Sequence, residues 1–449
     1  MSEHFDAVVI GSGPAGEVAI SRLAEQGLGV AFCERELIGG ECAYWACIPS
    51  KTLLRPAEAQ AESRRVAGVS EPRTDWPQVA KYRDFMIRDL DDAKQETGYR
   101  DQGVKVFRGE ARLAGAGKVE VAGTVLETER IVIATGSDAR IPPIDGLAQT
   151  GYWTNREATT VKELPESIMI VGGGPVGVEL GQFFARFGTR VTLVQSADRL
   201  VDREDPEVGQ LILDPLREEG IDVRMGVHAI SARRQNGERV LSLDDGTEAR
   251  GQELLIATGR SPRVGNIGLE SVGIEVNPKG VQIDERCRAG KGIWAVGDVT
   301  GVMPFTHVGM YQARIACADI AGDPARTDYS AIPRVVFSDP EIAAVGLTEA
   351  QAREQGIHVV TSRVDLADSI ARPWTYQENP TSGALGLVAD RKEKVLIGAW
   401  AVAPLAGEWI HQAALAIKAH IPLEVLRDTV AQFPTFSEAY LKGVERLDA

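Results

Sequence analysis

The sequence contains no apolar stretch of eighteen or more residues, which excludes the usual membrane-spanning helix. Its first residues also lack the basic patch, apolar core and cleavage site of a secretory signal. Basic residues are too few for a nucleic-acid-binding protein, because 49 Lys and Arg stand against 64 Asp and Glu and the net charge is -15 at pH 7. We therefore expect a cytoplasmic protein that has neither a membrane nor a nucleic acid as its partner.

Cysteine is also scarce, and the 449 residues include only Cys33, Cys42, Cys47, Cys287 and Cys317. A small, odd number argues against structural disulfides and fits a reducing compartment, where a disulfide is more often catalytic. No grouping of residues indicates a metal site. The length is about three times the ~150 residues of a typical domain, so roughly three packed units are expected, each with its own core.

Residues 5–34 have the pattern of a strand, a glycine turn and a helix. One apolar run precedes the turn, and a second ends at Glu34. The glycines of this G-x-G-x-x-G motif are Gly11, Gly13 and Gly16. The first permits a tight turn, the second lets the backbone approach a pyrophosphate, and the third lets the helix pack on the strand. An acidic side chain at the position of Glu34 can hold a ribose hydroxyl, so this segment is predicted to bind a dinucleotide.

The whole arrangement recurs 161 residues later, with Gly172, Gly174 and Gly177 at the turn. In this second copy Gln195 stands in place of the acidic residue, and Arg199 and Arg203 follow it. A neutral side chain removes the repulsion of a 2′-phosphate, and the arginines are able to pair with one. These residues favour NADPH slightly. The alternative is that both arginines are solvated loop residues, which leaves NADH open.

Cys42 and Cys47 lie shortly after the first dinucleotide unit, within GGECAYWACIPSKTLL. As a structural staple the pair makes little sense, because closing so small a loop contributes only about 2 kcal/mol in the chain-entropy model. A redox role explains the pair better. Its place in the sequence puts it next to the cofactor of the first unit.

Further motifs follow in order along nearly the whole chain: ATGSDARIPPIDG, VGGGPVGVELG, ATGRSPR, WAVGDVTG, VVFSDPEIAAVGLTE and AGEWIHQAALAI. With GSGPAG and CIPSK, they resemble the FAD-dependent pyridine nucleotide-disulfide oxidoreductases, which include dihydrolipoamide dehydrogenase, glutathione reductase and mercuric reductase. The resemblance implies an α/β fold with two Rossmann-like dinucleotide-binding domains and a C-terminal α+β dimerisation domain. The expected boundaries are residues 1–150 and 275–325 for FAD, 151–274 for NAD(P), and 330–449 for the interface of a homodimer.

The resemblance also implies the role of each site residue. Cys47 would form the charge-transfer thiolate beside the flavin, and Cys42 would be the interchange thiol that meets the substrate. Lys51 and Glu179 match an ion pair near the reactive flavin nitrogen, and Asp298 matches the residue that binds the ribityl chain. The other cofactor-binding positions implied by the motifs are Thr135, Gly136 and Gly259.

Two departures from the family's pattern change the expected function. Tyr44 and Trp45 stand between the cysteines, where the family has small residues and an asparagine; they either narrow the substrate entrance, stack on a planar substrate, or pack. Near the C-terminus, the family's His-Pro-Thr-x-x-Glu motif reads FPTFSE, so Phe433 replaces the histidine that exchanges a proton with the interchange thiol, while Glu438 is kept. His411 or His420 from the same domain is the alternative proton donor.

A missing general acid predicts poor reduction of ordinary disulfides, because such a group is typically worth 10²- to 10⁴-fold. We therefore expect an NAD(P)H oxidoreductase with an atypical small-molecule acceptor: a quinone, a metal ion, an electrophile or an unusual disulfide. Mercuric reductases also lack this histidine, but they carry a C-terminal cysteine pair, and this chain has no cysteine after Cys317. The alternatives are a dihydrolipoamide dehydrogenase subunit of a 2-oxo acid complex and a redox-sensing flavoprotein with little turnover.

Overall fold

The computed structural model describes residues 2–380 and 383–448, and the chain divides into two compact units. The first comprises residues 1–50, 81–140 and 259–328. The second comprises residues 51–80, 141–258 and 329–449. The three-domain boundaries expected from the sequence stay a prediction.

A six-stranded sheet forms the centre of the first unit. Its order is β20 (Arg288–Gly290), β21 (Ile293–Ala295), β8 (Ile131–Ile133), β2 (Ala7–Ile10), β3 (Val30–Glu34) and β4 (Lys105–Arg108). All neighbouring strands are parallel except β20 and β21, which are antiparallel. Every residue of β2 is buried, as expected for a central parallel strand. Because side chains alternate along a strand, Ala7 and Val9 join one buried cluster while Val8 and Ile10 join another.

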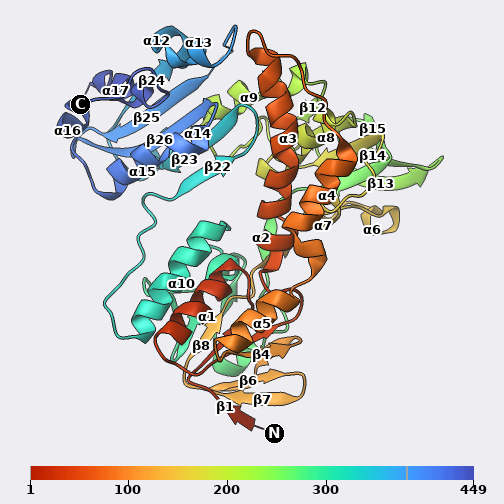
Figure 1. Cartoon of the computed structure of the whole chain (residues 1–449), viewed down its shortest axis with the longest axis vertical. Coiled ribbons are helices and arrows are strands. Elements are labelled where there is room, and N and C mark those ends of the chain that lie inside the picture. Colours follow the sequence, from red (N-terminus) through yellow and green to blue (C-terminus); the bar gives the residue numbers. More distant parts are fainter. Residues whose placement is uncertain (1, 381–382, 449) are drawn as a thin grey trace. The chain divides into compact units, whose positions relative to one another are not determined.

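Helices α1 (Pro14–Glu25) and α10 (Thr306–Ile320) lie side by side against one face of this sheet (Figure 1). The buried cluster that contains Val8 and Ile10 also includes residues of a small four-stranded sheet. The order of this sheet is β1 (Ser2–His4), β7 (Thr124–Glu127), β6 (Lys118–Val121) and β5 (Ala111–Leu113). A two-stranded sheet pairs β9 (Ser137–Ala139) with β17 (Arg260–Pro262). Helix α5 (Ala93–Asp101) precedes β4, and the short helix α2 (Gly40–Tyr44) follows β3.

The second unit contains a second parallel sheet with the same strand-turn-helix arrangement. Its strands are β12 (Asp222–Met225), β11 (Arg190–Gln195), β10 (Ser167–Val171) and β16 (Glu253–Ile256), in that order. Helix α8 (Pro175–Arg186) follows β10, and α9 (Pro206–Glu218) follows β11. An antiparallel sheet comprises β13 (Ala229–Gln235), β14 (Glu238–Leu243) and β15 (Glu248–Gly251). The predicted α/β class and the repeated strand-turn-helix unit are confirmed.

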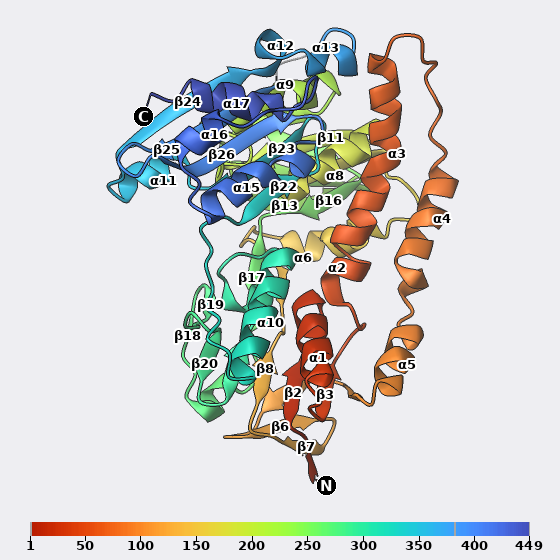
Figure 2. The same cartoon turned by 60° about the vertical axis from the view of Figure 1, so that its left-hand side comes forward.

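A separate antiparallel sheet of five strands follows in the chain. Its order is β22 (Pro333–Val336), β23 (Glu341–Gly346), β26 (Val395–Ala403), β25 (Ala384–Asp390) and β24 (Val359–Asp365). Helices α15 (His411–Lys418) and α17 (Glu438–Glu445) pack against it, and both are visible in blue in Figure 2. This α+β part carries Phe433 and Glu438.

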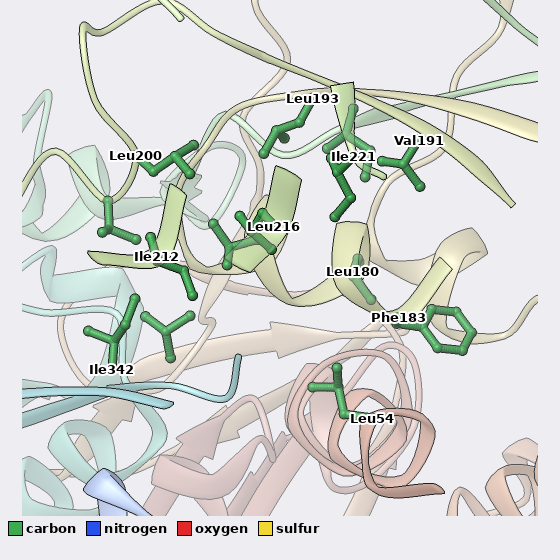
Figure 3. Close-up of a cluster of buried hydrophobic side chains, with 14 of the residues drawn as sticks. Leu54, Leu180, Phe183, Val191, Leu193, Leu200, Ile212, Leu216, Ile221 and Ile342 are labelled. Carbon is green, nitrogen blue, oxygen red and sulfur yellow. The ribbon is translucent and has the colours of Figure 1, made fainter. Parts of the chain in front are cut away.

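Helix α3 (Cys47–Arg65) begins in the first unit and continues into the second. Within the second unit, Leu54 of α3 belongs to the same buried cluster as Leu180 and Phe183 of α8 (Figure 3). Burying each such side chain contributes roughly 1.5–3 kcal/mol. This packing holds the part of α3 that lies in the second unit against α8.

Candidate active site

The first glycine turn has the geometry that a dinucleotide needs. Gly11 has φ +96°, and a Cβ there would lie 2.4 Å from the carbonyl oxygen of Ala134. A Cβ on Gly16 would lie 2.1 Å from the carbonyl oxygen of Gly11, so only glycine lets the helix approach the strand. At Gly13, in contrast, a Cβ would meet nothing within 4 Å. Helix α1 begins at the next residue, so the turn presents open space and helix-end N–H groups to a phosphate.

Glu34 lies at the end of β3 and is buried, as the ribose-binding position requires. Its Oε2 accepts hydrogen bonds from the backbone N and the Oγ of Ser12, at 2.9 and 2.7 Å. These bonds fix the carboxylate beside the glycine turn. The residues present therefore fit the adenosine half of a dinucleotide.

The second glycine turn repeats this geometry. Gly172 has φ +116° and a Cβ on Gly177 would lie 1.8 Å from the carbonyl oxygen of Gly172, whereas Gly174 again faces open space. Gln195 lies at the end of β11, where its Oε1 accepts from the N of Gly173 at 3.0 Å. It thus occupies the position of Glu34 without the charge, and this turn also fits a dinucleotide.

The two arginines that follow Gln195 differ in their surroundings. Arg199 donates to the backbone oxygen of Asp202 at 2.8 Å and lies 3.4 Å from Asp198. Arg203 is exposed. The Arg203 guanidinium can therefore turn toward a phosphate without breaking a hydrogen bond to another described residue, whereas that of Arg199 cannot.

The cysteine pair lies in the first unit, with Cys42 in α2 and Cys47 at the first position of α3. The neighbouring Cys47 side chain, together with burial, raises the pKa of the Cys42 thiol above its ordinary value, so the two sulfurs lie close enough to interact. The Sγ of Cys47 also lies 3.4 Å from Oγ1 of Thr306, at the start of α10. The two thiols predicted from the sequence are thus brought together.

The other three cysteines have a different environment. Cys33, Cys287 and Cys317 are buried, and burial raises the pKa of each thiol to about 12. Burial also keeps these three sulfurs away from any soluble substrate. Cys42 and Cys47 are partly exposed, and they remain the candidates for redox chemistry.

Lys51 and Glu179 form the predicted ion pair, within the second unit. The Nζ of Lys51 lies 2.6 Å from Oε2 of Glu179, whose side chain is only 7% exposed. The other carboxylate oxygen accepts from the backbone N of Phe337 at 2.9 Å, and the Lys51 ammonium lies 4.7 Å from the centre of the Phe337 ring. The backbone N–H bond fixes the position of the Glu179 carboxylate, and the ring face attracts the Lys51 ammonium.

The remaining predicted cofactor positions cluster in the first unit. Asp298 accepts a hydrogen bond from Oγ of Ser137 at 2.6 Å, and Thr135 donates to the backbone oxygen of Arg263 at 2.8 Å. Gly136 and Gly259 both have positive φ, at +74° and +109°. A Cβ on Gly136 would meet nothing within 4 Å, which is consistent with a ligand-facing position.

Phe433 does not pack into the core: it is 74% exposed. Among the described residues, the buried Oε2 of Glu438 has no hydrogen-bond partner, which is unusual for a buried polar atom. Both alternative proton donors, His411 and His420, are exposed on the same unit. The segment FPTFSE thus combines an exposed aromatic ring with a carboxylate oxygen that has no hydrogen-bond partner among the described residues.

No role in the site was predicted from the sequence for two residues that contact it. They are Thr306, which lies beside Cys47, and Phe337, which contacts Lys51 and Glu179. Tyr44 was left open between substrate contact and packing, and the structure decides for packing because it is fully buried. Trp45 is partly buried.

Within residues 2–380 and 383–448, no group of three or more His, Cys, Asp or Glu is placed to hold a metal ion. Over the same residues, every helix is too short or too polar to span a bilayer.

Comparison with known proteins covers almost the whole chain. Residues 5–313 match the family described as pyridine nucleotide-disulphide oxidoreductase, and residues 332–443 match its dimerisation domain. Mercuric reductase of Streptomyces lividans is 37% identical, covering 97% of this chain and 94% of that protein. Dihydrolipoyl dehydrogenase of Thermus scotoductus is 32% identical, covering 99% and 97%. The Cu(II) complex of the HOCl-induced flavoprotein disulfide reductase RclA from Escherichia coli superposes with a TM-score of 0.87 at 30% identity, covering 98% and 100%.

Proposed function

Because the chain belongs to the pyridine nucleotide-disulphide oxidoreductase family, we propose that it passes electrons from NADPH or NADH to the Cys42–Cys47 pair and then to a thiophilic metal ion. The family is FAD-dependent and takes its electrons from NAD(P)H, and the enzyme is a flavoprotein disulfide reductase-type oxidoreductase. Bound FAD would accept hydride from the nicotinamide and supply the electron pair that opens the disulfide.

The chain's own residues have distinct roles in this proposal. Gly13, Glu34 and Asp298 hold FAD, and Gly174 and Gln195 hold the nicotinamide dinucleotide. Glu179 orients the Lys51 ammonium, which stabilises negative charge next to it. Cys47 takes the thiolate charge, while Cys42 stays protonated until it meets the acceptor.

Phe433 is the observation that favours a metal ion over a disulfide. A disulfide acceptor releases a thiolate that needs a proton, and the residue that would supply it is an exposed phenyl ring. A metal ion bound by thiolates needs no such proton, and soft thiolates select ions such as Cu(I). Mercuric reductases and a Cu(II) complex stand among the relatives, which supports the same class of acceptor.

The electron balance is simple for copper. One NAD(P)H gives two electrons, two Cu(II) ions become two Cu(I), and NAD(P)⁺ and one proton are released. Between the two half-reactions, the Cys42–Cys47 disulfide is reduced to a dithiol and then reoxidised. A two-thiol site suits a product ion of low coordination number.

An acceptor panel under anaerobic conditions tests the proposal. With NADPH or NADH as donor, we expect Cu(II) to be reduced at least tenfold faster than lipoamide or oxidised glutathione, and Cys42→Ser to abolish this reduction. Cys317→Ala, which removes a buried thiol outside the pair, is the matched control and should retain it. Faster reduction of a quinone that survives Cys42→Ser, or family-typical turnover of lipoamide, would contradict the metal proposal.

The choice of nicotinamide has its own test. We propose a preference for NADPH because Gln195 is neutral and two arginines follow it. Replacing both Arg199 and Arg203 with alanine is expected to raise the KM for NADPH about tenfold and to leave the KM for NADH nearly unchanged, since one charged hydrogen bond contributes about 1.5–3 kcal/mol. Initial-rate kinetics with both donors measure this. Arg217→Ala, an exposed arginine on α9, is the control, and equal effects on both donors would exclude phosphate recognition by the pair.

A homodimer is part of the proposal. Residues 332–443 match a dimerisation domain, and the segment 415–433 exposes Leu415, Val425, Val430 and Phe433. Exposed apolar side chains concentrated in this way mark interaction surfaces. Glu438 would then meet the cysteine pair of the second copy.

A further inference from the structure

Tyr44 lies between the two redox cysteines in sequence, yet its side chain is fully buried within the first unit. Its hydroxyl donates to the backbone oxygen of Ile38 at 3.0 Å. The Tyr44 hydroxyl oxygen in turn accepts from Nη1 of Arg88 at 3.1 Å, and the guanidinium carbon lies 5.6 Å from the centre of the Tyr44 ring. Burial raises the pKa of Tyr44, so the hydroxyl keeps the proton that it donates.

A second set of hydrogen bonds reaches the same segment, residues 36–38. The backbone N of Ile38 donates to Oδ2 of Asp92 at 2.7 Å. Nη1 of Arg108 donates to that carboxylate at 2.8 Å and to the backbone oxygen of Glu36 at 3.0 Å. Both backbone groups of Ile38 are thus occupied, one through Tyr44 and Arg88, the other through Asp92.

The backbone that carries Arg88 is strained. Arg88, Asp89 and Leu90 have φ values of +56°, +50° and +60°, three successive non-glycine residues in the left-handed region. Such residues are individually unfavourable and persist only where surrounding contacts hold them. All three are exposed, so burial of their side chains does not explain the turn. The turn brings the Arg88 guanidinium to the Tyr44 hydroxyl and ring, and it brings the Asp92 carboxylate to the backbone N of Ile38.

We propose that Arg88 is a positioning residue for the redox pair: through Tyr44 it holds the Cys42–Cys47 loop in the conformation that brings the two sulfurs together. This inference rests on the proposed redox role of the pair. The clamp consists of the contacts of Arg88 with Tyr44 and of Tyr44 with the backbone of Ile38. A loop held in this way raises the effective concentration of one thiol at the other and stabilises the disulfide against reduction.

The disulfide–dithiol equilibrium of purified holoenzyme in glutathione buffers measures the clamp without any turnover. Tyr44→Phe removes one hydroxyl and Arg88→Met removes the guanidinium. Each is expected to lower the equilibrium constant for disulfide formation about tenfold, which corresponds to about 30 mV. The double variant should shift no further than the larger single variant, because the two groups act as one unit. Arg88→Lys should recover only part of the shift, since an ammonium lacks the planar fork.

Arg314→Met is the matched control, because Arg314 stacks on Tyr311 at the same distance of 5.6 Å, outside the network. It should leave the equilibrium unchanged. An unchanged equilibrium in Tyr44→Phe and Arg88→Met, additive effects in the double variant, or an equal shift in Arg314→Met would each overturn the inference. Reduction of the wild-type disulfide by NAD(P)H is measured separately, so failure of the redox role itself remains distinguishable.

Discussion

Phe433→His is expected to raise NAD(P)H-dependent reduction of lipoamide and oxidised glutathione tenfold or more. Glu438, five residues on, is unsatisfied in the described structure and can orient the new imidazole and stabilise its charged form. The side chain at position 433 is exposed, so the substitution does not disturb the core. The gain should remain below the full general-acid factor of 10²–10⁴, because the rest of the pocket was not selected for these substrates.

The half-reactions separate this effect from a change in folding or cofactor content. Flavin reduction by the nicotinamide, followed by stopped flow, should be the same in wild type and Phe433→His, and only reoxidation by the disulfide should accelerate. Val430→His is the matched control, since Val430 is 95% exposed and lies in the same segment. It should give no gain, and Glu438→Gln added to Phe433→His should remove most of it. If wild type already reduces lipoamide as fast as its relatives do, another group supplies the proton and Phe433 only packs in the dimer.

The glycine turns could be predicted from the sequence because their constraints are local. A motif of six residues predicts the positive φ at Gly11 and Gly172. It also predicts the helix packing at Gly16 and Gly177, where the preceding turn leaves no space for a Cβ. The positions of Glu34 and Gln195 could be predicted in the same way, because each residue ends the strand that lies beside the glycine turn. The ion pair of Lys51 with Glu179 joins residues 128 positions apart and came from the family resemblance, not from any local rule.

What the sequence could not predict are contacts made by side chains without a motif of their own. Thr306 lies 259 residues from Cys47, and nothing in a lone threonine at a helix start indicates a thiol partner. Arg88 and Tyr44 are 44 residues apart, and the left-handed turn that carries Arg88 uses Arg, Asp and Leu, of which only Asp is enriched at positive φ. The aromatic pair in the redox loop was noticed, but burial alone distinguishes a packed Tyr44 from one that meets a substrate.

The Cys42→Ser and Cys47→Ser variants are expected to differ in their absorption spectra. Two-electron reduction should give a long-wavelength thiolate-to-flavin charge-transfer band that Cys47→Ser abolishes and Cys42→Ser retains. Cys47 begins helix α3, where the helix dipole favours negative charge, and its sulfur lies beside the Thr306 hydroxyl. Cys47 and burial raise the pKa of the Cys42 thiol, so we expect a single negative charge to be carried by Cys47.

Both variants should lose acceptor reduction by about 10³-fold or more, because the disulfide cannot form in either, while the band separates their roles. Absorbance spectra during anaerobic titration with NADPH and NADH measure it, with Cys317→Ala as the control for thiol number. Thr306→Ala should weaken the band without removing it, since one hydrogen bond contributes about 1 kcal/mol and the helix end remains. A band that survives Cys47→Ser and is lost in Cys42→Ser would reverse the assignment, and with it the proposal that Cys42 is the sulfur that meets the metal ion.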